Sequence, residues 1–180
     1  TVTNNTTGCT STTYPITVTV NPLPTITLGA NPGVCRGVTT ANLTYSATTG
    51  SPDRYSIDYD AAANAAGFAD VALAVLPASP IVLVVPGAAP AATYNANLTV
   101  TNNTTGCTST TYPITVTVNP IPTITLGANP GVCRGVTTAN LTYIATTGTP
   151  DRYSIDYDAS ANSAGFADVA LAVLPASPIV

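Results

Sequence analysis

The chain has 180 residues, and only 12 of them are charged: eight aspartates and four arginines, with no lysine, glutamate, histidine, methionine or tryptophan. The absence of histidine and lysine excludes imidazole bases, Ser-His-Asp triads, histidine metal ligands and Schiff bases. Four arginines against eight aspartates cannot form the basic surface that nucleic acid requires. We therefore expect a protein that is not an enzyme and does not bind nucleic acid.

An internal repeat begins with the first residue. Residues 1–82 return as residues 99–180 without a gap, which is a period of 98 residues, and only five positions differ. A unit of this length exceeds an ankyrin or leucine-rich turn and has the size of one small β-sandwich domain. Because near-identical copies indicate recent duplication, we interpret the 180 residues as a slice of a longer array.

Proline pairs set the phase of the repeat. Asn21-Pro22-Leu23-Pro24 returns as Asn119-Pro120-Ile121-Pro122, and two prolines in three positions favour a stiff, extended linker. On this phase, residues 1–21 are the C-terminal strands of a preceding repeat. Residues 22–119 form one complete repeat, and residues 120–180 form the N-terminal two-thirds of the following one.

The first half of the complete repeat contains three predicted strands and a helical insert. Polar and apolar residues alternate in residues 25–28, 38–48 and 55–59, as in half-buried strands. Residues 29–37 are rich in turn formers and carry Cys35. A short helix is predicted within residues 60–67, with Asp60 as its N-cap and Gly67 as its stop.

The second half continues the strand pattern. Residues 71–76 and 81–85 are apolar runs separated by prolines, and no run approaches the ~20 residues of a membrane-spanning helix, so we expect buried strands and no membrane insertion. Residues 94–100 and 114–118 alternate again, with a turn at 102–106. About seven short strands per repeat predict an all-β fold made of tandem β-sandwich repeats.

Three motifs together resemble a known family. They are the strand Ala92–Val100 (ATYNANLTV), where Ala92 stands in the usual glycine position, Val34-Cys35-Arg36-Gly37 before a strand, and Gly106-Cys107 before the strand that ends in the linker. The set is similar to the tandem immunoglobulin-like, PKD-like repeats of giant surface proteins of gliding bacteria. The resemblance implies export by the type IX route, a role in adhesion or in surface filaments connected with gliding motility, and no catalytic residues.

Each repeat contributes two cysteines. An even count in a charge-poor β repeat favours an oxidising, extracellular setting, and no CxxC spacing suggests zinc. The simplest pairing is a disulfide between Cys35 and Cys107, with the partners of Cys133 and Cys9 lying outside the sequence. An immunoglobulin-like strand order would place Cys35 and Cys107 at opposite ends of a repeat, so a bond between domains or chains, or free thiols, are the alternatives.

Aspartates and tyrosines are the remaining candidate site residues. Asp58, Asp60 and Asp70 offer hard oxygen ligands for Ca²⁺, the one cofactor that the sequence suggests. The alternative is that Asp60 caps the helix and the other two carboxylates are solvated. The tyrosines of the repeat occupy alternating strand positions, which indicates core positions rather than a sugar-stacking surface.

The leading hypothesis is a structural one. We expect a repeat unit of a long extracellular filament or adhesin stalk on a bacterial cell surface, whose partners are neighbouring repeats and like chains. The alternative is a carbohydrate- or surface-binding module of a secreted adhesin. Tyrosine rings that project together into solvent would favour binding, whereas uniform Thr/Asn faces with buried tyrosines would favour the structural role.

Overall fold

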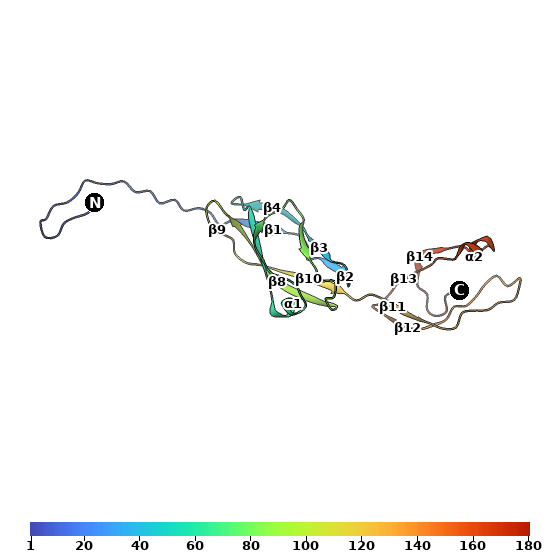
Figure 1. The fold of residues 1–180 in the computed structure, drawn as a ribbon. Helices are drawn as coiled ribbons and strands as arrows, with labels where there is room; N and C mark the ends of the chain where they lie inside the picture. The colour runs from blue at the N-terminus through green and yellow to red at the C-terminus, as the bar shows by residue number, and fades with distance from the viewer.

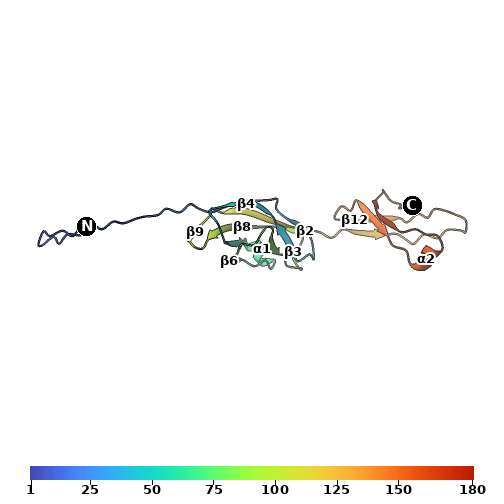
Figure 2. The ribbon, with the colours of Figure 1, turned by 90° about the horizontal axis from the view of Figure 1, so that it is seen from above.

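The computed structural model describes residues 1–180 and consists of fourteen β-strands and two five-residue helices. The all-β prediction is confirmed. In two perpendicular views the chain is elongated: an extended N-terminal segment leads into a central body, and a second body follows it along the same line (Figures 1 and 2). No helix has the length and apolar character needed to cross a bilayer.

The larger sheet of the central body runs through the complete repeat in the order β2-β10-β8-β5-β6, with the short β9 attached to β8. Residues 29–37, expected to be a turn-rich segment, contain a strand that pairs in parallel with the end of β10. This pairing joins residues more than 80 positions apart, so local turn signals could not reveal it. The strands are β2 (Gly33–Cys35), β5 (Arg54–Tyr59), β6 (Val71–Val75), β8 (Ala92–Asn102), β9 (Cys107–Thr108) and β10 (Tyr112–Asn119).

Two antiparallel pairs make up the rest of the central body. Strand β1 (Thr25–Leu28) pairs with β4 (Tyr45–Thr49), and β3 (Thr40–Leu43) pairs with β7 (Ile81–Val84). Only Thr44 separates β3 from β4, so one bent segment of chain contributes a strand to each of the two pairs. The amide of Ile26 in β1 donates to the hydroxyl of Tyr112 in β10 at 3.3 Å, which links these pairs to the larger sheet.

One hydrophobic core joins all of these strands. It contains 18 buried residues, and they come from the larger sheet and from the smaller pairs alike. Alternation along the strands supplies the core side chains: Leu98 of β8, Val116 of β10, Leu43 of β3 and Ile81 of β7 are all fully buried. Each such side chain stabilises the fold by roughly 1.5–3 kcal/mol through removal of its apolar surface from water.

The helical insert forms where the sequence predicts it. Helix α1 (Ala61–Ala65) begins after Asp60, whose Oδ1 accepts a hydrogen bond from the amide of Ala63 at 2.8 Å. Gly67 follows the helix with a φ of +98°, a conformation that favours glycine and ends the helix. The chain then places Phe68 in the core.

The second body repeats the first half of the central one. Thr123 lies opposite Thr147 as Thr25 lies opposite Thr49, with the same register shift in both pairs. Residues 83–98, which include the first part of β8, have no second copy in the sequence, and the second copy of β10 lies in the N-terminal segment. The elements present are β11 (Thr123–Leu126), β12 (Tyr143–Thr147), β13 (Arg152–Ile155), α2 (Ala159–Ser163) and β14 (Val169–Val173).

The N-terminal segment has the sequence of residues 99–119 and keeps their turn, with Thr3 bonded to Thr10 as Thr101 is to Thr108, but it has none of their core packing. Ile16 and Val18 are 88% and 82% exposed, whereas the same residues in β10, Ile114 and Val116, are 1% and 0% exposed. One sequence therefore occurs both as an isolated extended chain and as a core strand. The difference is the presence of the remaining strands of its repeat.

The surface carries hydroxyl groups rather than charges. A single ion pair, Arg54 with Asp53, spans 3.9 Å and is partly solvated. Threonine hydroxyls instead pair across neighbouring strands. Exposed pairs of this kind include Thr25–Thr49 at 2.6 Å, Thr93–Thr117 at 3.3 Å and Thr3–Thr10 at 3.1 Å, and Thr101–Thr108 at 3.0 Å is a part-buried one.

Candidate functional site

The three aspartates proposed as calcium ligands are not assembled into a metal site. No group of three potential ligands converges anywhere in the structure. Asp60 is engaged by helix α1, and Oδ1 of Asp70 accepts a hydrogen bond from the amide of Tyr59 at 2.9 Å. The side chain of Asp58 is exposed on β5. Asp60 caps the helix and Asp58 is solvated, as in the alternative, whereas Asp70 is not merely solvated because it bonds to the backbone of Tyr59.

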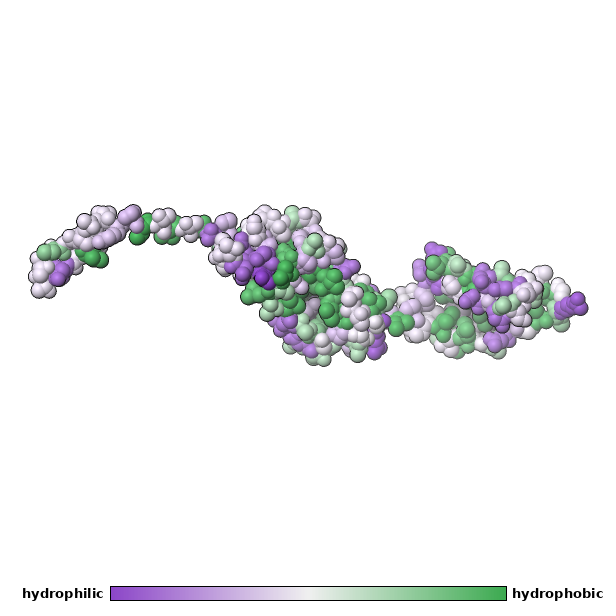
Figure 3. Space-filling model, turned by 45° about the horizontal axis from the view of Figure 1, so that its top comes forward, coloured by the Kyte–Doolittle hydropathy of each residue, from purple (hydrophilic) through white to green (hydrophobic).

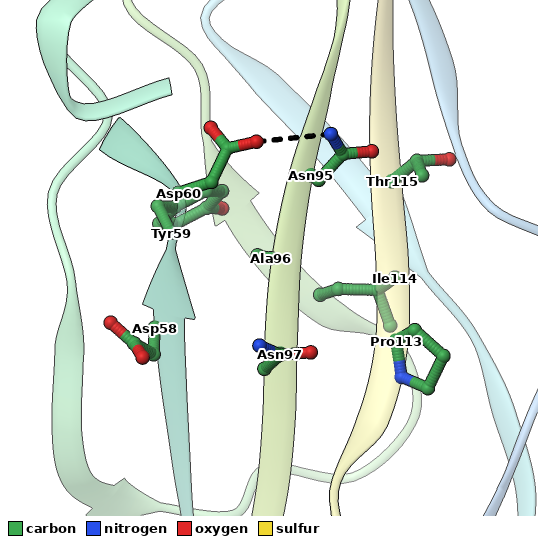
Figure 4. A pocket seen from close by; sticks show the side chains of 9 residues that line it. All are labelled: Asp58, Tyr59, Asp60, Asn95, Ala96, Asn97, Pro113, Ile114 and Thr115. Atoms are coloured by element: carbon green, nitrogen blue, oxygen red, sulfur yellow. Dashed lines mark hydrogen bonds between the residues drawn. The ribbon is translucent and has the colours of Figure 1, made fainter. Parts of the chain in front are cut away.

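A shallow hollow of about 290 Å³ lies beside Asp60, over strands β5, β8 and β10 (Figure 4). Within it, Asn95 of β8 donates a hydrogen bond from Nδ2 to Oδ2 of Asp60 at 3.0 Å. The amide of Ala63 and then the side chain of Asn95 hold the pKa of Asp60 below its usual value. Both carboxylate oxygens of Asp60 already have protein partners, so this side chain fixes the helical insert to β8.

The sequence did not identify Asn95 as a partner of Asp60. It stands at an outward position of a strand, 35 residues away, and only the pairing of β5 with β8 brings the two side chains together. An outward asparagine in a Thr/Asn-rich strand gives no signal by itself.

Three tyrosines of the complete repeat, Tyr45, Tyr94 and Tyr112, use their hydroxyls in hydrogen bonds within the fold. Tyr45 donates to the carbonyl of Pro77 at 2.6 Å, and Tyr94 donates to the carbonyl of Pro90 at 2.8 Å. Burial, followed by the neighbouring Tyr55, raises the pKa of Tyr59 to about 12. All five tyrosines of this repeat are buried or half-buried, so no platform of exposed rings is available for a sugar.

The cysteines form no disulfide, and the pairing of Cys35 with Cys107 is wrong for this structure. Cys35 ends β2 beside Asn119, at the end where the chain leaves the repeat. Cys107 lies beside Asn102, near the start of β10. The eight residues of β10 separate the two ends by roughly 24 Å, whereas the Cα atoms of a disulfide lie within about 7 Å.

An open apolar groove of about 580 Å³ runs through the second body, and hydrophobic residues gather on its surface (Figure 3). Ile124, Leu126 and Phe166 line it with exposures of 39%, 49% and 52%. In the complete repeat, Ile26 and Phe68 hold the positions of Ile124 and Phe166 and are 4% and 3% exposed. The groove is thus lined by residues whose counterparts are buried in the core of the central body.

Comparison with protein families, curated proteins and solved structures finds no match for this chain. The geometry offers braced carboxylates, internally bonded tyrosines and one unfinished apolar face.

Proposed function

We propose that the chain is a segment of a tandem array of β-sandwich repeats, and that the array forms a non-catalytic extracellular stalk or filament. The observation that carries this proposal is the contrast between identical sequences in complete and incomplete repeats. Ile114 is 1% exposed where the whole repeat is present, and Ile16 is 88% exposed where it is not. The apolar strand positions are buried only where all 98 residues of a repeat are present.

The strand order supports an immunoglobulin-like, PKD-like sandwich. In the larger sheet, β2, β10, β8, β5 and β6 follow one another, and the bent β3–β4 segment pairs with β1 and β7 on the other side of the core. Tyr94 near the start of β8 bonds to a carbonyl four residues upstream, as does the corner tyrosine of immunoglobulin-like domains. This arrangement is a scaffold, and no part of it implies a reaction.

The connection between repeats supports an elongated assembly. The linker Asn119–Pro122 contains two prolines, and the two bodies follow each other along one line (Figure 2). Pro122 is fixed to its own repeat, because a Cβ added to Gly148 would lie 3.0 Å from the Cα of Pro122. A short linker held at its end favours a regular spacing between repeats over free articulation.

Composition and resemblance support a bacterial cell-surface location. The surface is rich in threonine hydroxyls, carries little charge and exposes cysteines that play no part in the core. These properties suit a secreted rod whose partners are neighbouring repeats and like chains. The similarity to repeats of gliding-bacterium surface proteins adds type IX export and adhesion to the proposal.

The array can be tested by adding a copy of residues 83–119 after Val180, which completes the second repeat. We expect hydrogen exchange at the amides of Ile124 and Phe166 to slow to the level of Ile26 and Phe68. Small-angle scattering should then give two equal bodies at a fixed separation. A second body that stays open after the addition would refute the tandem-repeat proposal.

The location requires a separate test. Antibodies raised against residues 22–119 should label the exterior of intact, unpermeabilised cells that produce the protein, along stalks or filaments in immunogold electron microscopy. Labelling only after permeabilisation would contradict the surface role and would leave the repeat architecture unaffected.

A further inference from the structure

Two cysteines of the complete repeat lie at its opposite ends. Cys35 is the register partner of Asn119, and the amide of Arg36 donates to the carbonyl of Asn119 at 2.9 Å. Asn119 is also the first residue of the linker to the next repeat. Cys35 therefore lies at the exit end of its repeat.

Cys107 lies at the entry end. It pairs with Asn102, whose Nδ2 donates to the carbonyl of Gly50 at 2.9 Å. Gly50 packs closely on Pro24, since a Cβ added to it would lie 2.9 Å from the Cα of Pro24. Pro24 is the residue through which the chain enters the repeat from the preceding linker.

The linker brings these two kinds of end together. Three residue steps separate Asn119 from Pro122, the counterpart of Pro24, and they span at most about 10 Å. Each junction therefore receives one thiol from the exit end of one repeat and one thiol from the entry end of the next. We propose that Cys35 forms a disulfide with the counterpart of Cys107 in the following repeat, so that a covalent bond bridges each junction of the array.

The free thiols of this chain agree with that pairing. The partner of Cys35 would stand 98 positions after Cys107, which is beyond Val180, and the partner of Cys107 would stand in the repeat before residue 22. Cys9 and Cys133 likewise have no partner within residues 1–180. All four cysteines are free, and no two of them belong to the same junction.

The chemistry requires an accessible thiol and an oxidant. Cys35 is exposed and Cys107 is half-buried, and neither contributes to the core. One cysteine thiolate attacks a disulfide oxidant, either glutathione disulfide or an oxidoreductase, and forms a mixed disulfide while one thiol of the oxidant leaves. The second cysteine thiolate then attacks this mixed disulfide and releases the other thiol of the oxidant. The two cysteines lose two protons and two electrons, and the oxidant's disulfide is reduced to two thiols. The bond would give each junction a second connection beside the proline linker.

This inference rests on the proposed tandem array, and the same extended chain tests both. With a copy of residues 83–119 after Val180, the chain contains one complete junction and five cysteines. After oxidation with glutathione disulfide, we expect two of the five thiols to disappear at a rate that does not depend on protein concentration. Trypsin cleaves only after arginine here, so the peptide ending at Arg36 should be joined to the C-terminal peptide that begins at Tyr153.

Matched variants assign the bond. The cross-link should vanish in Cys35→Ser and persist in Cys9→Ser and Cys133→Ser, and the unextended chain should keep four free thiols. A folded second repeat with five free thiols, or cross-links only between chains at rates that rise with concentration, would overturn the disulfide proposal alone. A second repeat that stays open would overturn the tandem array and the disulfide with it.

Discussion

Phe68 and Phe166 are the same residue of the repeat in two different surroundings, which makes them a matched pair for mutation. The ring of Phe68 lies between Tyr59 and Tyr94, with centroid distances of 5.0 and 4.7 Å, and it is 3% exposed. Phe166 pairs with one aromatic ring, that of Tyr157, the counterpart of Tyr59, at 5.3 Å, and is 52% exposed. The difference between the effects of Phe68→Ala and Phe166→Ala on the free energy of unfolding therefore measures how much the complete repeat stabilises this ring.

We expect Phe68→Ala to lower the free energy of unfolding of the complete repeat by about 3–5 kcal/mol, the usual cost of removing a buried aromatic ring. Phe166→Ala should change the unfolding transition by no more than about 0.5 kcal/mol, as at an ordinary surface position. Urea unfolding followed by tyrosine fluorescence suits the chain, which has nine tyrosines and no tryptophan. With a slope of about 1–3 kcal/mol per molar urea, the midpoint for Phe68→Ala falls by at least about 1 M.

Equal shifts for the two substitutions would refute this reasoning, because they would mean that the second copy buries its phenylalanine as well as the first. A shift below about 1 kcal/mol for Phe68→Ala would refute the assignment of this residue to the core. If Phe68→Ala prevents folding altogether, Phe68→Leu provides a smaller loss on the same scale and tests the same contrast.

Three further predictions concern the helical insert, a buried phenol and a crowded glycine. Because the pKa of Asp60 is lowered in the folded state, Asp60 stabilises the fold above its ordinary pKa near 4 and loses this effect as the pH falls through the lowered pKa. Asp60→Asn keeps an acceptor for the helix cap, so its urea midpoint should drop less than that of the unaltered chain as the pH is lowered. Asp60→Ala removes the acceptor and should be less stable at neutral pH. Tyr59 should ionise near pH 12 in an absorbance titration, so its contribution to stability is complete below pH 10 and disappears as the pH rises through about 12. Gly50→Ala and Gly106→Ala both place alanine at a positive φ, at a cost of about 1–2 kcal/mol. Only Gly50→Ala also forces a Cβ to 2.9 Å from the Cα of Pro24. Thermal unfolding should therefore show Gly50→Ala to be the more destabilising of the two by roughly 1–3 kcal/mol.

Features set by neighbouring residues could be predicted from the sequence. Alternation gave the strands β8 and β10 with their buried positions, and the spacing from Asp60 to Gly67 gave the limits of helix α1. In both cases the physical cause, side-chain periodicity or a cap, acts within a few residues.

Features that depend on strand order could not be predicted from local patterns. The parallel pairing of Cys35 with Asn119 and the contact of Asp60 with Asn95 both require knowledge of which strands are neighbours. The calcium hypothesis failed for the same reason, since a shared sequence neighbourhood did not bring Asp58, Asp60 and Asp70 to one point. The cysteine pairing within one repeat failed because strand order places its members at opposite ends.

The threonine pairs on the surface have a consequence for the surroundings in which the protein can work. Dissolved salt weakens attraction between exposed charges, and its reach shortens from about 30 Å at 0.01 M to about 3 Å at 1 M. Hydroxyl pairs such as Thr25–Thr49 carry no net charge, and the single ion pair of the chain is already partly solvated. The electrostatic part of the stability of a rod built from this repeat would therefore change little between dilute and concentrated salt.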